Sequence, residues 1–145
     1  MHKHRNFGFT LIEMVIVVAI IAILSIVAYP SYAKHTYRSR RSDGQNFLMQ
    51  VASAEERYYT NFNTYTTNLT GSGATGLGMA AATSSAGYYT VTVVAAGAGI
   101  GSGFSATATP QGLQAGDKWC ATLTIDSAGN KTSTSTAGDS NGSCW

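Results

Sequence analysis

An apolar stretch near the N-terminus constrains the fold of this chain of 145 residues more than any other feature. Residues 9–28 contain one charged side chain, Glu13, and every residue of 14–24 is apolar. As a helix these residues would span roughly 30 Å, the thickness of the hydrocarbon core of a bilayer. The rest of the chain is rich in Gly, Ser and Thr and is poorly suited to enclosing such a helix on all sides. The sequence therefore predicts a helix that inserts into a membrane.

A secretory signal peptide is the first alternative for this segment. Lys3 and Arg5 form a basic region ahead of the apolar run, as a signal peptide requires. No Ala-x-Ala-like cleavage site closes the run, however, which ends at Tyr29 and Pro30. A signal peptide also has no use for an acid in its apolar stretch. These features favour a segment that stays on the protein.

Glu13 requires an explanation, because a carboxylate inside a bilayer costs on the order of a few kcal/mol and usually marks function. In one interpretation Glu13 lies near the membrane interface, where it reaches water or takes up a proton. In the other, it pairs with a positive group of a second molecule, because residues 9–28 contain no cation.

The residues around Glu13 resemble the N-terminus of type IV prepilins. The resemblance rests on the order Gly8-Phe9-Thr-Leu-Ile-Glu13, on the apolar run, and on Tyr29-Pro-Ser-Tyr32. It implies that a prepilin peptidase cuts between Gly8 and Phe9 and that the new terminal residue, Phe9, is N-methylated. It also implies that Glu13 neutralises the terminal amine of a neighbouring subunit, since opposite charges in an apolar bundle must pair.

The resemblance divides the chain into three parts. Residues 1–8 are a cleaved leader, 9–32 a transmembrane and filament-core helix, and 33–145 a periplasmic or extracellular head. Basic residues at 34–41 alone would favour the reverse orientation by the positive-inside rule. The resemblance instead places the protein in the inner membrane with its head in the periplasm, and later in a pilus on the surface of a Gram-negative bacterium. The implied partners are other pilin subunits, the prepilin peptidase and the inner-membrane assembly machinery.

The remaining pattern predicts one α+β domain of the type IV pilin fold. Pro30 should kink or loosen the helix. The periodic apolar residues that follow predict an amphipathic helix over 33–60. Its charged residues, Arg41 and Glu55 among them, are expected to face solvent or a neighbouring subunit. Alternating side chains predict strands over 88–94, 104–109, 118–125 and 131–135, and residues 71–86 form a loop. The expected architecture is a long N-terminal helix packed on a roughly four-stranded antiparallel sheet with a C-terminal disulfide loop.

Two cysteines, Cys120 and Cys144, occur in the chain. A bridge between them would stabilise the head by roughly 3 kcal/mol, whereas free thiols or a metal pair are disfavoured because no histidine follows His35. Type IV pilins close a C-terminal region with one disulfide, which the resemblance assigns to Cys120 and Cys144. Residues 116–120 and the terminal Cys-Trp are most similar to PilE-type minor pilins.

The sequence predicts no catalytic residue, cofactor or metal, and therefore no enzyme. His2, His4 and His35 all precede the head. Three of the acidic residues, Asp117, Asp126 and Asp139, are interpreted as isolated turn-forming residues rather than as an acid/base pair. The glycine-rich stretches lack the lysine of a phosphate-binding loop.

The expected function is that of a structural subunit, of minor-pilin type, in pilus biogenesis, adhesion or twitching motility. Two alternatives are a pseudopilin of a type II secretion system, disfavoured by the disulfide loop, and a DNA-receptor pilin of a natural competence system. Removing Lys3 and Arg5 from the nine basic residues leaves seven, against seven acidic ones. A neutral chain is not committed to nucleic acid, and the arginines near the anchor more often contact phospholipid or acidic groups of neighbours, so nucleic acid is not expected as a partner.

Overall fold

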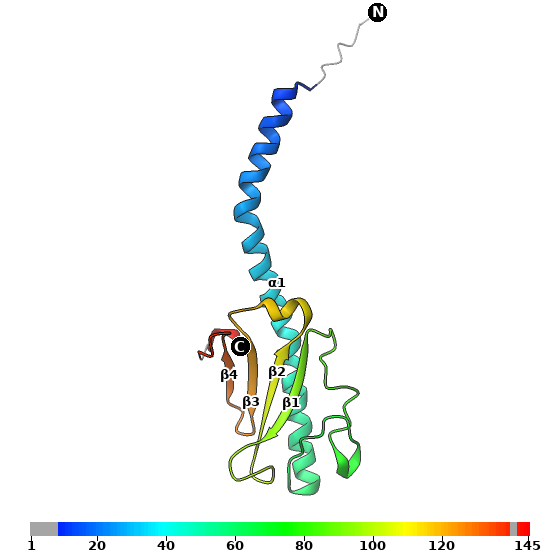
Figure 1. The fold of residues 1–145 in the computed structure, drawn as a ribbon. Coiled ribbons are helices and arrows are strands. Elements are labelled where there is room, and N and C mark those ends of the chain that lie inside the picture. The colour runs from blue at the N-terminus through cyan, green and yellow to red at the C-terminus, as the bar shows by residue number, and fades with distance from the viewer. Residues whose placement is uncertain (1–8, 140–141) are drawn as a thin grey trace, which may run out of the picture. The chain divides into compact units, whose positions relative to one another are not determined.

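A computed structural model describes residues 9–139 and 142–145 of the chain (Figure 1). One long helix, α1 (Leu11–Phe62), precedes a small sheet. The chain divides into two compact units, Met1–Thr36 and Tyr37–Trp145. The first holds the apolar part of α1. The second, called the head below, holds the remainder of α1 and the whole sheet.

The helix α1 ends where its backbone turns into the left-handed region. Asn63 has a φ of 54°, and its N–H donates to the carbonyl of Tyr59 at 2.8 Å. Asparagine is one of the few residues that adopt this conformation at low cost, and a residue in it closes a helix C-terminus. Both predicted helical segments, 9–32 and 33–60, thus lie almost wholly within one element.

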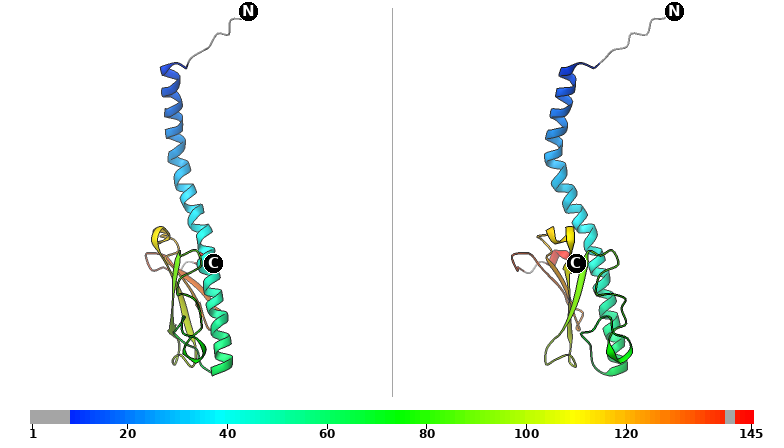
Figure 2. Two further views of the ribbon diagram at one scale, coloured as in Figure 1. Left: turned by 90° about the vertical axis from the view of Figure 1, so that its right-hand side faces the viewer. Right: turned by 45° about the vertical axis from the view of Figure 1, so that its right-hand side comes forward.

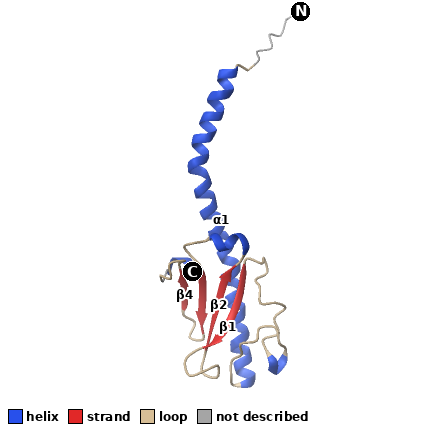
Figure 3. Ribbon diagram, viewed as in Figure 1, coloured by secondary structure: helices blue, strands red, loops and turns tan. Residues whose placement is uncertain are grey.

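The sheet is an antiparallel meander of four strands in the order β1-β2-β3-β4 (Figure 3). The strands are β1 (Tyr89–Ala95), β2 (Phe104–Pro110), β3 (Thr122–Asp126) and β4 (Lys131–Thr134). Three short 3₁₀ helices, η1 (Gly73–Thr75), η2 (Gly112–Gly116) and η3 (Gly142–Cys144), lie in the connections. The β3–β4 turn is built on Asp126, whose Oδ1 accepts from the N–H groups of Ala128 and Asn130, both at 2.9 Å.

The core of the head lies between α1 and one face of the sheet, which Figure 2 shows nearly edge-on beside the helix. Burial alternates along β1 and β2, because successive strand residues point to opposite faces. The helix contributes apolar residues spaced three and four apart, which place them on one face. The largest apolar side chains that are fully buried are Tyr89, Phe104, Leu48, Leu123, Val51 and Val91.

Both edges of the sheet are covered in part by other segments of the head. Along β1, the N–H of Val91 donates to the carbonyl of Ala82 at 2.7 Å. At β4, the indole N–H of Trp145 donates to the carbonyl of Thr132 at 2.7 Å. Open strand edges invite pairing with other chains, so these contacts limit uncontrolled association of the head.

The predicted fold class is confirmed, with three local corrections. The third strand begins at Thr122 rather than at residue 118, because the preceding residues are held by the disulfide and by the helix. Arg41 and Glu55 were expected to be solvated or subunit-facing, but the Arg41 side chain is only 13% exposed and Glu55 is fully buried. Asp117 is also buried and paired, rather than an isolated turn residue.

Within residues 9–139 and 142–145 no single helix is long and apolar enough to cross a membrane, whereas Leu11–Ile26 and Ser31–Phe62 together have the length and composition to do so as a bent pair. The side chain of Pro30, to which the sequence assigns a kink, lies outside the described residues.

Gly44 of α1 lies directly against the ring of Tyr89 in the sheet. A Cβ at this position would lie 2.8 Å from ring atoms of buried Tyr89. Helix propensity alone predicts that Gly44→Ala stabilises by about 1 kcal/mol. We expect instead that overpacking destabilises the head by about 1–3 kcal/mol. Urea unfolding of the full chain in detergent micelles, followed by tryptophan fluorescence, measures this, because both tryptophans lie in the head.

Asn46→Ala is the matched control, since Asn46 is exposed on the same helix. It should change the free energy of unfolding by less than about 0.5 kcal/mol. A Gly44→Ala protein at least as stable as the wild type would contradict the close packing of α1 on Tyr89.

Candidate assembly helix and head surface

Thr10 lies directly before α1, and Glu13 lies in the first turn of the helix. The backbone N–H of Glu13 donates to Oγ1 of Thr10 at 3.3 Å, so Thr10 caps the helix. Ser/Thr followed three residues later by Glu is the capping-box pattern, and an acid in the first turn also interacts favourably with the helix dipole. Glu13 therefore has a local role in starting the helix.

This local role leaves the charge of Glu13 uncompensated. Its side chain is exposed, and none of the described cations forms an ion pair with it. Phe9, the residue predicted to become the N-terminus, is 76% exposed. Gly8, on the other side of the predicted cleavage position, lies outside the described residues.

The apolar part of α1 exposes large side chains on every side of the helix. Between residues 11 and 26 their exposed fractions run from 45% at Val17 to 82% at Leu11. A helix that is apolar all round requires a membrane or other helices around it, and an exposed apolar surface of this extent marks an interaction site. The set consists of Leu11, Ile12, Met14, Val15, Ile16, Val17, Val18, Ile20, Ile21, Ile23, Leu24 and Ile26.

An ion pair joins α1 to the connection between β2 and β3 within the head. Nε of Arg41 donates to Oδ2 of Asp117 at 2.7 Å, and Nη2 donates to Oδ1 at 2.9 Å. The Asp117 side chain is fully buried. Two parallel hydrogen bonds fix the position of the guanidinium as well as neutralising it. The pairing of these two residues was not predicted from the sequence, because seventy-six positions separate them.

The ion pair continues into a buried polar network. The amide of Gln114 donates to Oη of Tyr89 at 3.0 Å and to Oδ2 of Asp117 at 3.3 Å. Burial is the largest cause that raises the pKa of Tyr89 to about 12. Tyr89 therefore stays neutral in physiological conditions, and the network holds the ring of Tyr89 against Gly44.

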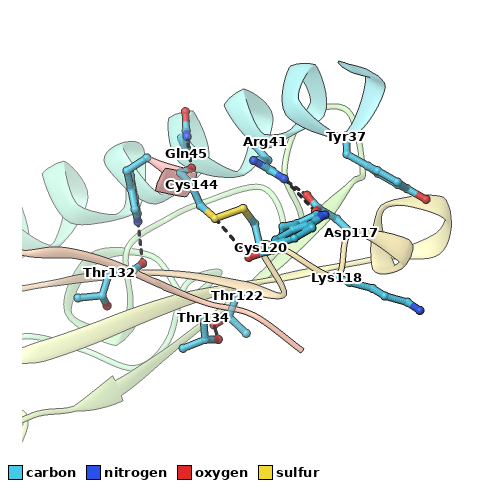
Figure 4. The surroundings of a disulfide bond; sticks show 12 residues. Tyr37, Arg41, Gln45, Asp117, Lys118, Cys120, Thr122, Thr132, Thr134 and Cys144 are labelled. Carbon is cyan, nitrogen blue, oxygen red and sulfur yellow. Dashed lines mark hydrogen bonds and ion pairs between the residues drawn. A yellow bond between two sulfur atoms is a disulfide. The ribbon is translucent and has the colours of Figure 1, made fainter. Parts of the chain in front are cut away.

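The disulfide Cys120–Cys144 lies beside this network (Figure 4). The two Cα atoms are 5.8 Å apart, and both cysteines are buried. Nε2 of Gln45 on α1 donates to the carbonyl of Cys144 at 2.7 Å. The C-terminal disulfide loop of the predicted fold is thus present, and it is attached to both the helix and the sheet.

The cations of the head outside the ion pair are scattered, and several lie beside aromatic rings: Arg40 is half-buried, and Lys118 and Lys131 are exposed. The guanidinium of Arg40 lies 4.8 Å from the ring centroid of Tyr88, and Nζ of Lys131 lies 5.2 Å from that of Trp145. Lys118 is exposed beside Trp119, whose side chain is 63% exposed. Such groups contact phosphates and stack on bases in nucleic-acid-binding proteins, although structural packing accounts for many similar pairs.

The acidic residues are engaged in structural contacts. Hydrogen bonding from the Asn130 side chain, together with backbone N–H groups of the turn, lowers the pKa of Asp126. This supports the prediction that Asp126 forms a turn. Among the described residues no three His, Cys, Asp or Glu side chains gather in a way that could hold a metal ion.

A long N-terminal helix, a four-stranded antiparallel sheet and a C-terminal disulfide define the class as a type IV pilin. Residues 30–124 match the family described as type IV minor pilin ComP, DNA uptake sequence receptor. Residues 3–29 match the prokaryotic N-terminal methylation motif. The chain therefore belongs to this family of type IV minor pilins, as predicted from its N-terminus. The pilin family and fold are structural rather than enzymatic.

One solved structure that resembles the chain is a type IV pilin from Shewanella oneidensis. The two share 25% sequence identity with a TM-score of 0.46, over 66% of this chain and 89% of that one. No curated protein matches the chain.

The ion pair yields the second prediction. Asp117→Asn leaves Arg41 largely buried without a carboxylate, and breaking a buried pair in this way costs roughly 3–5 kcal/mol. The double variant Arg41→Met, Asp117→Asn should lose less than Arg41→Met and Asp117→Asn added together, because it removes both charges. The free energy of unfolding, again from urea and tryptophan fluorescence, gives the coupling between them.

Arg38→Met serves as the control, because Arg38 is exposed one turn earlier on the same helix. The free energy of unfolding of Arg38→Met should lie within about 0.5 kcal/mol of that of the wild type. Purely additive losses in the double variant would show that Arg41 and Asp117 do not act as a pair.

Proposed function

We propose that this minor pilin enters a pilus through residues 9–32 after cleavage between Gly8 and Phe9, and that its head is displayed on the filament. The observation that carries the proposal is the apolar part of α1, exposed on every side and carrying one acid in its first turn. A bilayer can surround this surface before assembly, and the helices of other pilins can surround it afterwards.

In this mechanism the inner membrane holds the prepilin with its head on the periplasmic side. The prepilin peptidase removes residues 1–8 and methylates Phe9, which leaves a positively charged terminal amine. That amine pairs with Glu13 of a neighbouring subunit as the helix moves from lipid into the filament core. An unpaired ammonium or carboxylate in this core would cost several kcal/mol, so the pairing sets the stagger between neighbours.

The third prediction tests this pairing. Glu13→Gln keeps the size of the side chain and removes its charge. We expect the amount of this chain in sheared filaments to fall more than about ten-fold, because the loss of a desolvated charge pair costs at least about 1.4 kcal/mol. The amount in the inner membrane should stay unchanged. Quantitative mass spectrometry of the filament and membrane fractions measures both.

Thr10→Ala separates charge pairing from helix capping. It removes the hydroxyl that caps the first turn but leaves the carboxylate of Glu13, so incorporation should remain close to that of the wild type. Wild-type incorporation of the Glu13→Gln chain would rule out the charge-pairing step.

DNA binding by the head is a second candidate function, favoured by the description of the family as a DNA uptake sequence receptor. The sequence weighed against it, because the chain after the leader is electrically neutral. The exposed cations Lys118 and Lys131, with Trp119 and Trp145 beside them in sequence or space, are the groups of the disulfide region that could contact phosphates and bases. So few contacts predict a shallow salt dependence.

The fourth prediction concerns this binding. Duplex DNA should bind the full chain in detergent micelles with an affinity that falls as salt rises, with a log–log slope of about −2 if both lysines contact phosphates. Lys118→Glu should weaken binding and reduce the slope, whereas Arg57→Glu, an equal charge change on exposed α1, should not. No salt-dependent binding, or equal losses in both variants, would contradict a DNA site at the disulfide region.

A further inference from the structure

The head contains one buried carboxylate that neither assembly nor the disulfide region explains. Glu55 lies on α1 and is fully buried. Its Oε2 accepts a hydrogen bond from the backbone N–H of Thr66 at 3.1 Å, whereas its Oε1 is buried without a hydrogen-bond partner. A carboxylate held in this way is costly when ionised.

Thr66 belongs to residues 63–68, the segment between the end of α1 and buried Leu69, here called the post-helix segment. The segment has other contacts as well: the hydroxyl of Tyr65 donates to Oε1 of Glu56 on α1 at 3.4 Å, and the carbonyl of Asn68 accepts from the N–H of Leu77 at 3.0 Å. The N–H of Tyr65 donates to the carbonyl of Ile100 in the β1–β2 turn at 3.2 Å, and the Tyr65 ring packs at 5.1 Å from that of Phe104. The bond from Thr66 to Glu55 therefore fastens to α1 a segment that also contacts the β1–β2 turn.

The surroundings of Glu55 offer no compensating cation. The titratable groups acting on it are Glu56 on the same helix and Tyr65 in the post-helix segment. No described Lys, Arg or His forms an ion pair with it. The ring of Tyr59 stacks on the ring of Tyr65, with 4.7 Å between the two centroids. This contact brings no cation to Glu55.

We propose that Glu55 is a proton-operated latch: protonated, it keeps the post-helix segment closed on α1, and ionised, it favours release of that segment so that the carboxylate reaches water. The device is independent of subunit assembly, because all of its parts lie within the head. Release would also loosen the β1–β2 turn, which Tyr65 contacts, so the latch makes two neighbouring surface segments of the head responsive to pH.

The direction of the effect follows from the balance of forces at the carboxylate. Burial is the largest cause acting on Glu55 and raises its pKa from 4.5 to about 7, the Thr66 N–H opposes it, and Glu56 adds to it. In the released segment the carboxyl would have its ordinary pKa. The closed state therefore binds more protons, and closure weakens as pH rises through the interval between the two values. Linkage with these values predicts that the opening equilibrium rises about ten-fold between pH 6 and pH 8.

Amide hydrogen exchange on the full chain in detergent micelles tests the latch. The protection of Thr66 and Tyr65, each corrected for the intrinsic pH dependence of exchange, should fall about ten-fold from pH 6 to pH 8 in the wild type. Glu55→Gln is neutral at both pH values, so its protection should be independent of pH. Glu56→Gln makes the same charge change one residue away at an exposed position and keeps an Oε1 that can accept from the Tyr65 hydroxyl, so it should retain most of the wild-type response.

A direct titration of the Glu55 carboxyl carbon by NMR in the wild type keeps the test decisive if Glu55→Gln does not fold. A midpoint near neutral pH supports the latch, and a midpoint near the ordinary value for glutamate overturns it. Three results of the exchange experiment overturn the latch as well. These are protection that does not change with pH in the wild type, protection that still falls with pH in Glu55→Gln, and protection that no longer changes with pH in Glu56→Gln.

Discussion

The ion pair between Arg41 and Asp117 is the constraint on which the arrangement of the head depends. It fixes α1 to the connection between β2 and β3 through two hydrogen bonds, with Asp117 fully buried. Gln114 extends the same network to Tyr89, whose ring packs on Gly44. The disulfide then attaches the C-terminus beside it. Polar ties thus set the position of the helix on the sheet, while burial of apolar side chains supplies most of the stabilising free energy.

The two parts of the chain satisfy their apolar surfaces in opposite ways. The head closes its core within itself and covers part of both sheet edges. The apolar part of α1 leaves its large side chains exposed and therefore depends on lipid or on other helices.

Sequence patterns predicted the parts of the structure that depend on local periodicity. Apolar spacing predicted α1, alternation predicted four strands, and the order of Gly8, Phe9 and Glu13 predicted the family. The buried charges were missed, because Arg41, Glu55 and Asp117 look locally like solvated residues. Their partners lie far away or in irregular segments: Arg41 and Asp117 are brought together only by tertiary packing, and Glu55 meets a backbone N–H that no side-chain pattern reveals. One signal for Glu55 was available in the sequence: its spacing from the apolar residues of the helix places this charged residue on the apolar face.

Mass spectrometry of sheared surface filaments tests the central claim, that this chain is a processed pilus subunit, most directly. The account predicts a chain that begins at N-methylated Phe9, carries the Cys120–Cys144 disulfide and is present in the filament fraction. A chain that stays in the inner membrane and never enters filaments, or that enters them with residues 1–8 attached, would contradict it.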